Sequence, residues 1–116
     1  MQLILDQMTK QCETKIDEVF PWDVVDMLKE NKELLLVDVR EPYEFDFAHI
    51  TNSLNVPRGI LETTASFGYE DTIPMLADSR EKPIVLICRS GKRSLWAACT
   101  LQMLEFKKLY SMKTGV

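Results

Sequence analysis

Residues 83–98 read PIVLICRSGKRSLWAA and contain the clearest strand pattern in the chain. Its first five residues form an apolar run, which is typical of a strand buried on both faces of a parallel sheet. Cys88 stands at the end of that run. The polar stretch Arg89–Arg93 cannot continue the strand, and Ser94 fits the cap or first turn of a helix. Residues 95–106 are rich in helix formers, so the stretch predicts a strand, a short loop and a helix.

The flanking sequence continues this alternation of strands and helices. Strands are expected at residues 16–20, 34–38, 53–56 and 109–110, and helices at residues 21–32 and 42–48. Between residues 58 and 81 the pattern is weaker: Gly68 is expected to break the segment, and residues 73–78 to form a helical turn. Strands that alternate with helices predict an α/β fold with a central, mostly parallel sheet and helices on both faces.

Length and composition favour one globular domain. The chain has 116 residues, 46% of them hydrophobic and 28% charged, which suffices for one core. Residues 1–14 are weakly helical and are expected to form an N-terminal extension to a domain of residues 15–116. The net charge of -4 argues against general binding of nucleic acid or of anionic membranes. There is neither a membrane-length apolar run nor a secretory signal pattern at the start, so we expect a cytoplasmic location.

Three cysteines, Cys12, Cys88 and Cys99, form an odd set without a CxxC motif. A disulfide framework and a cysteine zinc site are therefore not expected, and neither a metal nor an organic cofactor is implied. Cys99 lies within a predicted helix and is expected to pack there, and Cys12 is assigned no role. His49, the single histidine, is interpreted as structural because no nucleophile lies near it in the sequence.

Cys88 is the candidate nucleophile. In open α/β sheets ligands bind beyond the carboxyl ends of the strands, where Cys88 is placed. Its loop leads into a helix N-terminus, whose free N–H groups attract anions, and Gly91 permits a tight turn. Arg89, Lys92 and Arg93 add positive charge, so the surroundings favour a thiolate, the form that attacks sulfur. The alternative is a buried, inert cysteine beside a solvated turn.

Asp38 and Arg40 end a predicted strand at the same edge of the sheet as Cys88. Both could support the site by touching it. The preferred interpretation is a buried ion pair that holds the neighbouring loops.

Three stretches resemble the rhodanese family, in the order expected for it. The loop CRSGKRS after PIVLI resembles the family's active-site loop. VDVREPYEFDFAHITNSLNVP, residues 37–57, resembles its D-x-R…E…H-I…N-x-P signature, which Asp38, Arg40, Glu44, His49 and Asn55 match. LYSMKTG, residues 109–115, resembles its late strand and turn.

The resemblance implies a rhodanese fold and a sulfurtransferase activity. Cys88 would accept a sulfane sulfur from thiosulfate or a persulfide and pass it to a thiol or cyanide. The amides from Arg89 through Ser90, Gly91, Lys92 and Arg93 to Ser94 would cradle that sulfur, and the basic side chains would attract the anion. The implied partners are a small anionic sulfur donor and a thiol acceptor, either a small molecule or a protein.

Two departures from the family pattern bear on these expectations. Two-domain thiosulfate sulfurtransferases have a basic residue four positions after the D-x-R arginine, whereas this chain has Glu44, as single-domain members do. Thiosulfate therefore need not be the physiological donor. The family also usually continues into a last helix, so the resemblance implies that a C-terminal helix is missing after Val116.

Two other functions remain open. A cysteine phosphatase or arsenate reductase of related fold needs five residues between the nucleophile and an arginine, and here four separate Cys88 from Arg93. The shorter loop suits a single sulfur atom. A sulfur-carrier or regulatory module that docks to a partner protein is the second alternative, although regulatory modules often lack the loop cysteine.

Overall fold

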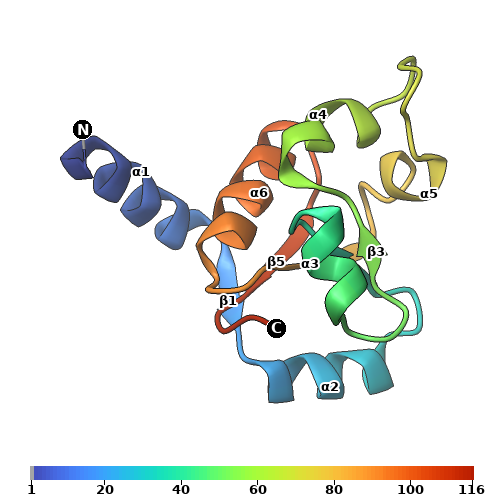
Figure 1. Ribbon diagram of the computed structural model, residues 1–116, viewed down its shortest axis with the longest axis horizontal. Coiled ribbons are helices and arrows are strands. Elements are labelled where there is room, and N and C mark those ends of the chain that lie inside the picture. Colours follow the sequence, from blue (N-terminus) through green and yellow to red (C-terminus); the bar gives the residue numbers. More distant parts are fainter. Residues whose placement is uncertain (1) are drawn as a thin grey trace.

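A computed structural model of the protein describes residues 2–116 and shows a five-stranded parallel sheet with the strand order β1-β5-β4-β2-β3 (Figure 1). The strands are β1 Asp17–Val19, β2 Leu35–Asp38, β3 Leu54–Asn55, β4 Pro83–Ile87 and β5 Lys108–Met112. The helices are α1 Gln2–Lys15, α2 Pro21–Glu30, α3 Pro42–Phe47, α4 Leu61–Thr64, α5 Pro74–Ala77 and α6 Lys92–Met103, with a 3-10 turn at Arg58–Ile60.

Strand β4 is the central strand of the sheet. Its side chains pack into two hydrophobic cores, one on each face of the sheet. Leu86 pairs with Val37 of β2 on one side and with Ser111 of β5 on the other. Alternate side chains of β4 point to opposite faces of the sheet. Every residue of β4 is buried because both faces are covered. This explains the unbroken apolar run and places the residue after the strand, Cys88, at the middle of the carboxyl edge.

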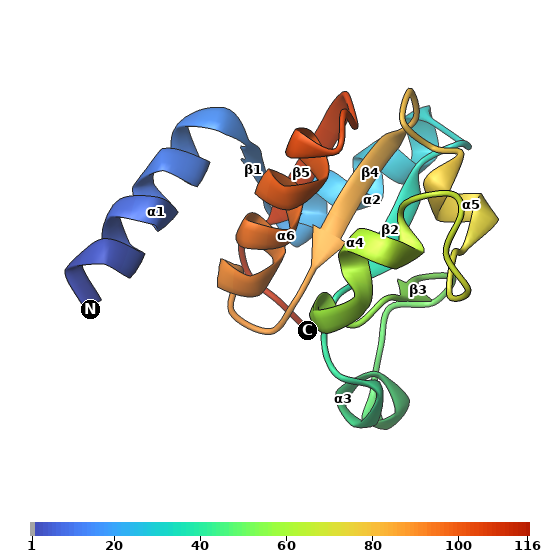
Figure 2. The same cartoon turned by 90° about the horizontal axis from the view of Figure 1, so that it is seen from above.

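Helices cover both faces of the sheet, as predicted. Leu61 of α4, Leu76 of α5 and Leu101 of α6 pack with one set of strand side chains. Val24 of α2 packs with the other set, which includes Val85 of β4. The views in Figures 1 and 2 agree with this arrangement, in which α2 lies on the opposite side of the sheet from α6.

The N-terminal helix α1 docks on α6 through its second half. The indole Nε1 of Trp96 donates to Thr9 Oγ1 at 3.0 Å. Cys12 is buried against the same surface, and burial together with the contact to Cys99 raises the pKa of the Cys12 thiol to about 12. Cys12 is therefore a neutral, packed side chain. Cys99 lies in α6 and packs against the core, as predicted.

The segment that follows β5 returns to the end of β4. The amide of Lys113 donates to the carbonyl of Val19 at 2.7 Å, and the amide of Val116 donates to the carbonyl of Cys88 at 3.1 Å. Within residues 2–116 no helix follows β5. None of the helices among these residues has the length and apolar character needed to cross a membrane.

Candidate active site

Cys88 follows the last residue of β4 and points into its own loop. The amide of Gly91 donates to Cys88 Sγ at 3.0 Å, and the thiol contacts Ser94 Oγ at 3.3 Å. The cysteine has 0% of its surface exposed. Its sulfur therefore sits in a polar cradle built from the loop backbone and the first turn of α6.

Gly91 makes this cradle possible. Its φ of 92° lies in the left-handed region, which strongly favours glycine, and it caps the start of α6. The helix begins at Lys92, three residues before Leu95, where the apolar pattern predicts that it starts. Ser94 is therefore in the first turn, one of the two positions predicted for it. A Cβ atom at Gly91 would collide with the carbonyl of Lys113.

Gly115 reaches the same loop from the end of β5. A Cβ atom there would collide with the carbonyls of Cys88 and Arg89. Two glycines thus allow the active-site loop and the segment after β5 to pack backbone against backbone.

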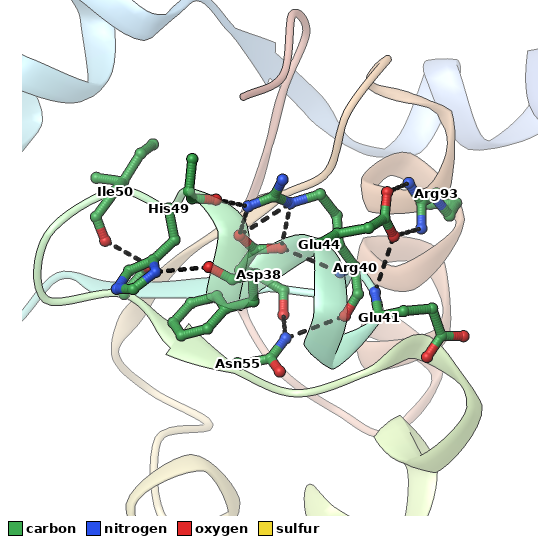
Figure 3. A network of polar contacts seen from close by, with 11 residues as sticks. Asp38, Arg40, Glu41, Glu44, His49, Ile50, Asn55 and Arg93 are labelled. Atoms are coloured by element: carbon green, nitrogen blue, oxygen red, sulfur yellow. Dashed lines mark hydrogen bonds and ion pairs between the residues drawn. The ribbon is translucent and has the colours of Figure 1, made fainter.

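The three predicted cations do not play the same part. Arg89 and Lys92 are exposed and form no ion pair with any residue that the structure describes. The guanidinium of Arg93 instead binds Glu44 of α3, with distances of 2.9 and 3.1 Å (Figure 3). This hydrogen-bonded pair, with the Glu41 amide, lowers the pKa of Glu44 to about 2. Of the three loop cations expected to attract an anion, Arg93 is therefore the one that already has a carboxylate partner.

Asp38 and Arg40 form a buried ion pair, as predicted from the sequence. Arg40 Nη2 lies 2.8 Å from Asp38 Oδ2 and also donates to the carbonyl of Ala48 at 2.7 Å. Asn55 Nδ2 donates to the carbonyls of both Asp38 and Arg40 (Figure 3). The pair thus ties the end of β2 to Ala48 at the C-terminal end of α3, the helix that carries Glu44.

A cavity of about 380 Å³ lies between α3 and the active-site loop, lined by Arg40, Tyr43, Glu44, Phe47, Ala48, Arg89 and Val116. Two of its aromatic side chains are largely exposed, Tyr43 at 75% and Phe47 at 92%. Figure 2 shows α3 projecting from the body of the domain near the end of β4. The cavity is therefore mostly apolar, with the exposed cation Arg89 at its loop side.

A sequence model of the rhodanese-like domain matches residues 21–116, which include the whole site just described. The chain belongs to the rhodanese-like domain family. The match leaves α1 and β1 outside it, although β1 pairs with β5 in the sheet.

Known proteins similar to this rhodanese-like chain fall into more than one functional class. The tRNA uridine(34) hydroxylase of Photorhabdus laumondii is 28% identical over 107 residues, which cover 89% of this chain. The chain spans only 28% of the length of that relative.

Two solved structures share the rhodanese-like fold over most of the chain. A protein of unknown function from Rhodopseudomonas palustris, described as a possible tyrosine phosphatase, has a TM-score of 0.84 and 25% identity, and the match covers 93% of this chain and 82% of that one. The polysulfide-sulfur transferase homodimer of Wolinella succinogenes has a TM-score of 0.70 and 28% identity, with coverage of 98% and 80%.

Sequence reasoning missed one polar member of this rhodanese-like site. Ser111 of β5 is fully buried, and its Oγ lies 2.8 Å from Ser94 Oγ. Its only signal in the sequence is a serine in a strand that is otherwise largely apolar. His49 lies apart from the loop: its ring stacks on Phe45, and its Nδ1 contacts the Phe45 carbonyl at 2.7 Å. These contacts agree with the structural interpretation of His49.

Proposed function

We propose that this rhodanese-like domain is a sulfurtransferase that carries a sulfane sulfur as a persulfide on Cys88. The Cys88 thiolate attacks the outer sulfur of the donor, so that a new S–S bond forms. The S–S bond of the donor breaks, and sulfite leaves with the electron pair when the donor is thiosulfate. A thiol or cyanide acceptor then removes the outer sulfur and regenerates the thiolate.

The observation that carries this proposal is the N–H group of Gly91, which donates to Cys88 Sγ at 3.0 Å. A hydrogen bond to the charged form favours that form, and the N-terminus of α6 adds its positive dipole end. Arg89 and Lys92 supply two free cations for an anionic donor. Because Cys88 is fully buried, loading requires movement of the atoms that cover its sulfur.

The test is a mass measurement. The protein is incubated separately with thiosulfate and with polysulfide, freed of excess reagent and weighed intact. We expect one added sulfur atom on the wild type and none on Cys88→Ala. Cys99→Ala is the control variant, because Cys99 lies outside the loop, and it should load like the wild type. If the wild type stays unmodified with both donors, the proposal is wrong.

A sulfur carrier or a regulatory docking module is the nearest alternative. A carrier would load on Cys88 but transfer only to a particular partner protein, whereas a docking module would bind its partner equally well as Cys88→Ala. Sulfur loading of the isolated chain, followed by transfer to cyanide or a small thiol, would favour the enzyme.

A phosphatase is less well supported, even though one structural neighbour is described as a possible tyrosine phosphatase. Four residues separate Cys88 from Arg93, and the Arg93 guanidinium is occupied by Glu44. Cys88-dependent release of phosphate from p-nitrophenyl phosphate would reverse this ranking. We do not propose tRNA hydroxylation, because the chain corresponds to only 28% of the hydroxylase it resembles.

A further inference from the structure

Three buried polar side chains form a line from Cys88 into the sheet. The Cys88 thiol lies 3.3 Å from Ser94 Oγ, and Ser94 Oγ lies 2.8 Å from Ser111 Oγ. All three residues have 0% of their surface exposed. Ser94 belongs to the first turn of α6, whereas Ser111 belongs to β5 and is remote from the loop in sequence.

The Ser94 hydroxyl has one proton and three possible acceptors. These are Cys88 Sγ, the Gly91 carbonyl at 3.2 Å and Ser111 Oγ. While Cys88 is a thiol, its own proton points to Ser94 Oγ, and the Ser94 proton is free to point to the Gly91 carbonyl. Once Cys88 becomes a thiolate, its sulfur can only accept hydrogen bonds. The Ser94 hydroxyl stabilises the thiolate only when its proton points to the sulfur.

We propose that Ser111 is a positioning residue that directs the Ser94 hydroxyl to the charged sulfur of Cys88. When the Ser111 hydroxyl donates to Ser94 Oγ, the Ser94 hydroxyl no longer donates to Ser111 and can donate to the sulfur. Two hydroxyl groups aligned in this way polarise each other in a dry environment and strengthen the terminal hydrogen bond. The sulfur then has two donors, the Gly91 amide and the Ser94 hydroxyl.

The position of Ser111 is fixed independently of the loop. Its strand β5 lies between β4 and β1, and Ser111 itself pairs with Leu86 on one side and Glu18 on the other. The hydroxyl is therefore held by the sheet, while Ser94 and Gly91 are held by the loop and α6. This inference rests on the proposed reactivity of Cys88 and adds a residue outside the loop to it.

The test measures thiolate formation directly. The ultraviolet absorbance of the thiolate is recorded against pH as the difference between each variant and the same variant carrying Cys88→Ala. In Ser111→Ala we expect the midpoint of thiolate formation to move to higher pH by roughly 0.3 to 1 unit, which is the size of one hydrogen bond. Sulfur loading near neutral pH should slow by roughly two- to tenfold.

Two further variants separate positioning from a merely structural role. Ser79→Ala removes another buried serine hydroxyl, one that donates to the Met75 carbonyl away from the loop, and should leave the midpoint unchanged. In a Ser94→Ala background, Ser111→Ala should have no additional effect, because Ser111 acts through Ser94.

The proposal is overturned if Ser111→Ala leaves the midpoint where the wild type has it. It is also overturned if the shift persists in the Ser94→Ala background. Failure of sulfur transfer is a separate outcome, because thiolate formation is measured without any sulfur donor.

Discussion

Glu44 determines how much positive charge the active-site loop offers to an anion. It binds the guanidinium of Arg93 at 2.9 Å. Arg40, which is paired with Asp38, donates to the carbonyl of Ala48 at the end of the same helix. The sequence showed Glu44 as a departure from the two-domain pattern, and the structure supplies the physical meaning of that departure. Within residues 2–116, two of the three loop cations, Arg89 and Lys92, have no acidic partner, whereas Arg93 has one.

Removing the charge of Glu44 should therefore increase the rate at which thiosulfate loads sulfur onto Cys88. In Glu44→Gln the neutral amide can still bond to Arg93, but the positive charge is no longer cancelled. We expect thiosulfate to load Cys88 roughly two- to fivefold faster at low salt, with a smaller gain at high salt. The control is Glu62→Gln, which breaks the exposed pair with Arg58. Unchanged or slower loading of Glu44→Gln, measured by stopped reactions and mass, would contradict this role.

The same carboxylate gives the fold a dependence on acid. Its pKa in the folded domain is about 2, below the ordinary value of 4.5. A lowered pKa stabilises the folded state above pH 4.5, and this contribution is lost as the pH falls toward 2. The free energy of unfolding should therefore drop by about 1–3 kcal/mol across this window on account of Glu44.

Urea unfolding at several pH values measures this contribution. The slope of stability against pH should be flatter in Glu44→Gln by that amount. Parallel slopes for the two proteins would show that the Glu44–Arg93 pair adds no stability.

Among the elements, those with a strong apolar pattern were predicted well. The five residues of β4 form the strand expected, and α2 and α3 begin at the prolines that mark their starts. The start of α6 was placed too late, because the polar residues Lys92 and Arg93 hide a first turn that depends on the left-handed Gly91. The short helix α4 was not predicted, since four residues carry too little periodic signal.

Removal of helix α1 would test the predicted boundary between the N-terminal extension, residues 1–14, and the domain of residues 15–116. We propose that residues 15–116 fold without α1, because the whole sheet is built from later elements and Cys12 is the only residue among positions 4–15 that is buried in a core. A variant lacking residues 1–14 should load sulfur but lose about 1–3 kcal/mol of unfolding free energy, since Cys12 and the Trp96–Thr9 hydrogen bond are lost. Chemical denaturation checks this expectation. A variant that is unfolded without denaturant would show that α1 belongs to the domain.

For the molecule as a whole, the sequence predicted the α/β class, the parallel sheet and the position of Cys88. It could do so because β4 is buried on both faces and the loop that follows is abruptly polar. Contacts between segments that are distant in the sequence could not be predicted from it. Neither the Glu44–Arg93 pair nor the Ser94–Ser111 contact has a local signature, because each depends on how separate elements meet at the edge of the sheet.

At Gly115 the segment after β5 packs tightly against the backbone of the active-site loop, and this contact leads to a prediction for the whole domain. In Gly115→Ala the new methyl group would collide with the carbonyls of Cys88 and Arg89, so the loop or the segment after β5 must shift. We expect a loss of about 1–3 kcal/mol in stability and at least a tenfold slower sulfur loading. Gly59→Ala is the matched control, because a Cβ atom at Gly59 meets nothing within 4 Å. Equal behaviour of the two variants in thermal unfolding and loading would refute the role of this contact.

The backbone contact between Gly115 and the loop also matters for how variants of this domain are interpreted. In a library of single substitutions scored for sulfur loading, the positions around Gly91 and those around Gly115 should share one profile of tolerance, although they lie far apart along the chain. The amino acids accepted at the two stretches should also depend on each other. Loop transplants from other domains would then succeed only when both stretches are exchanged together.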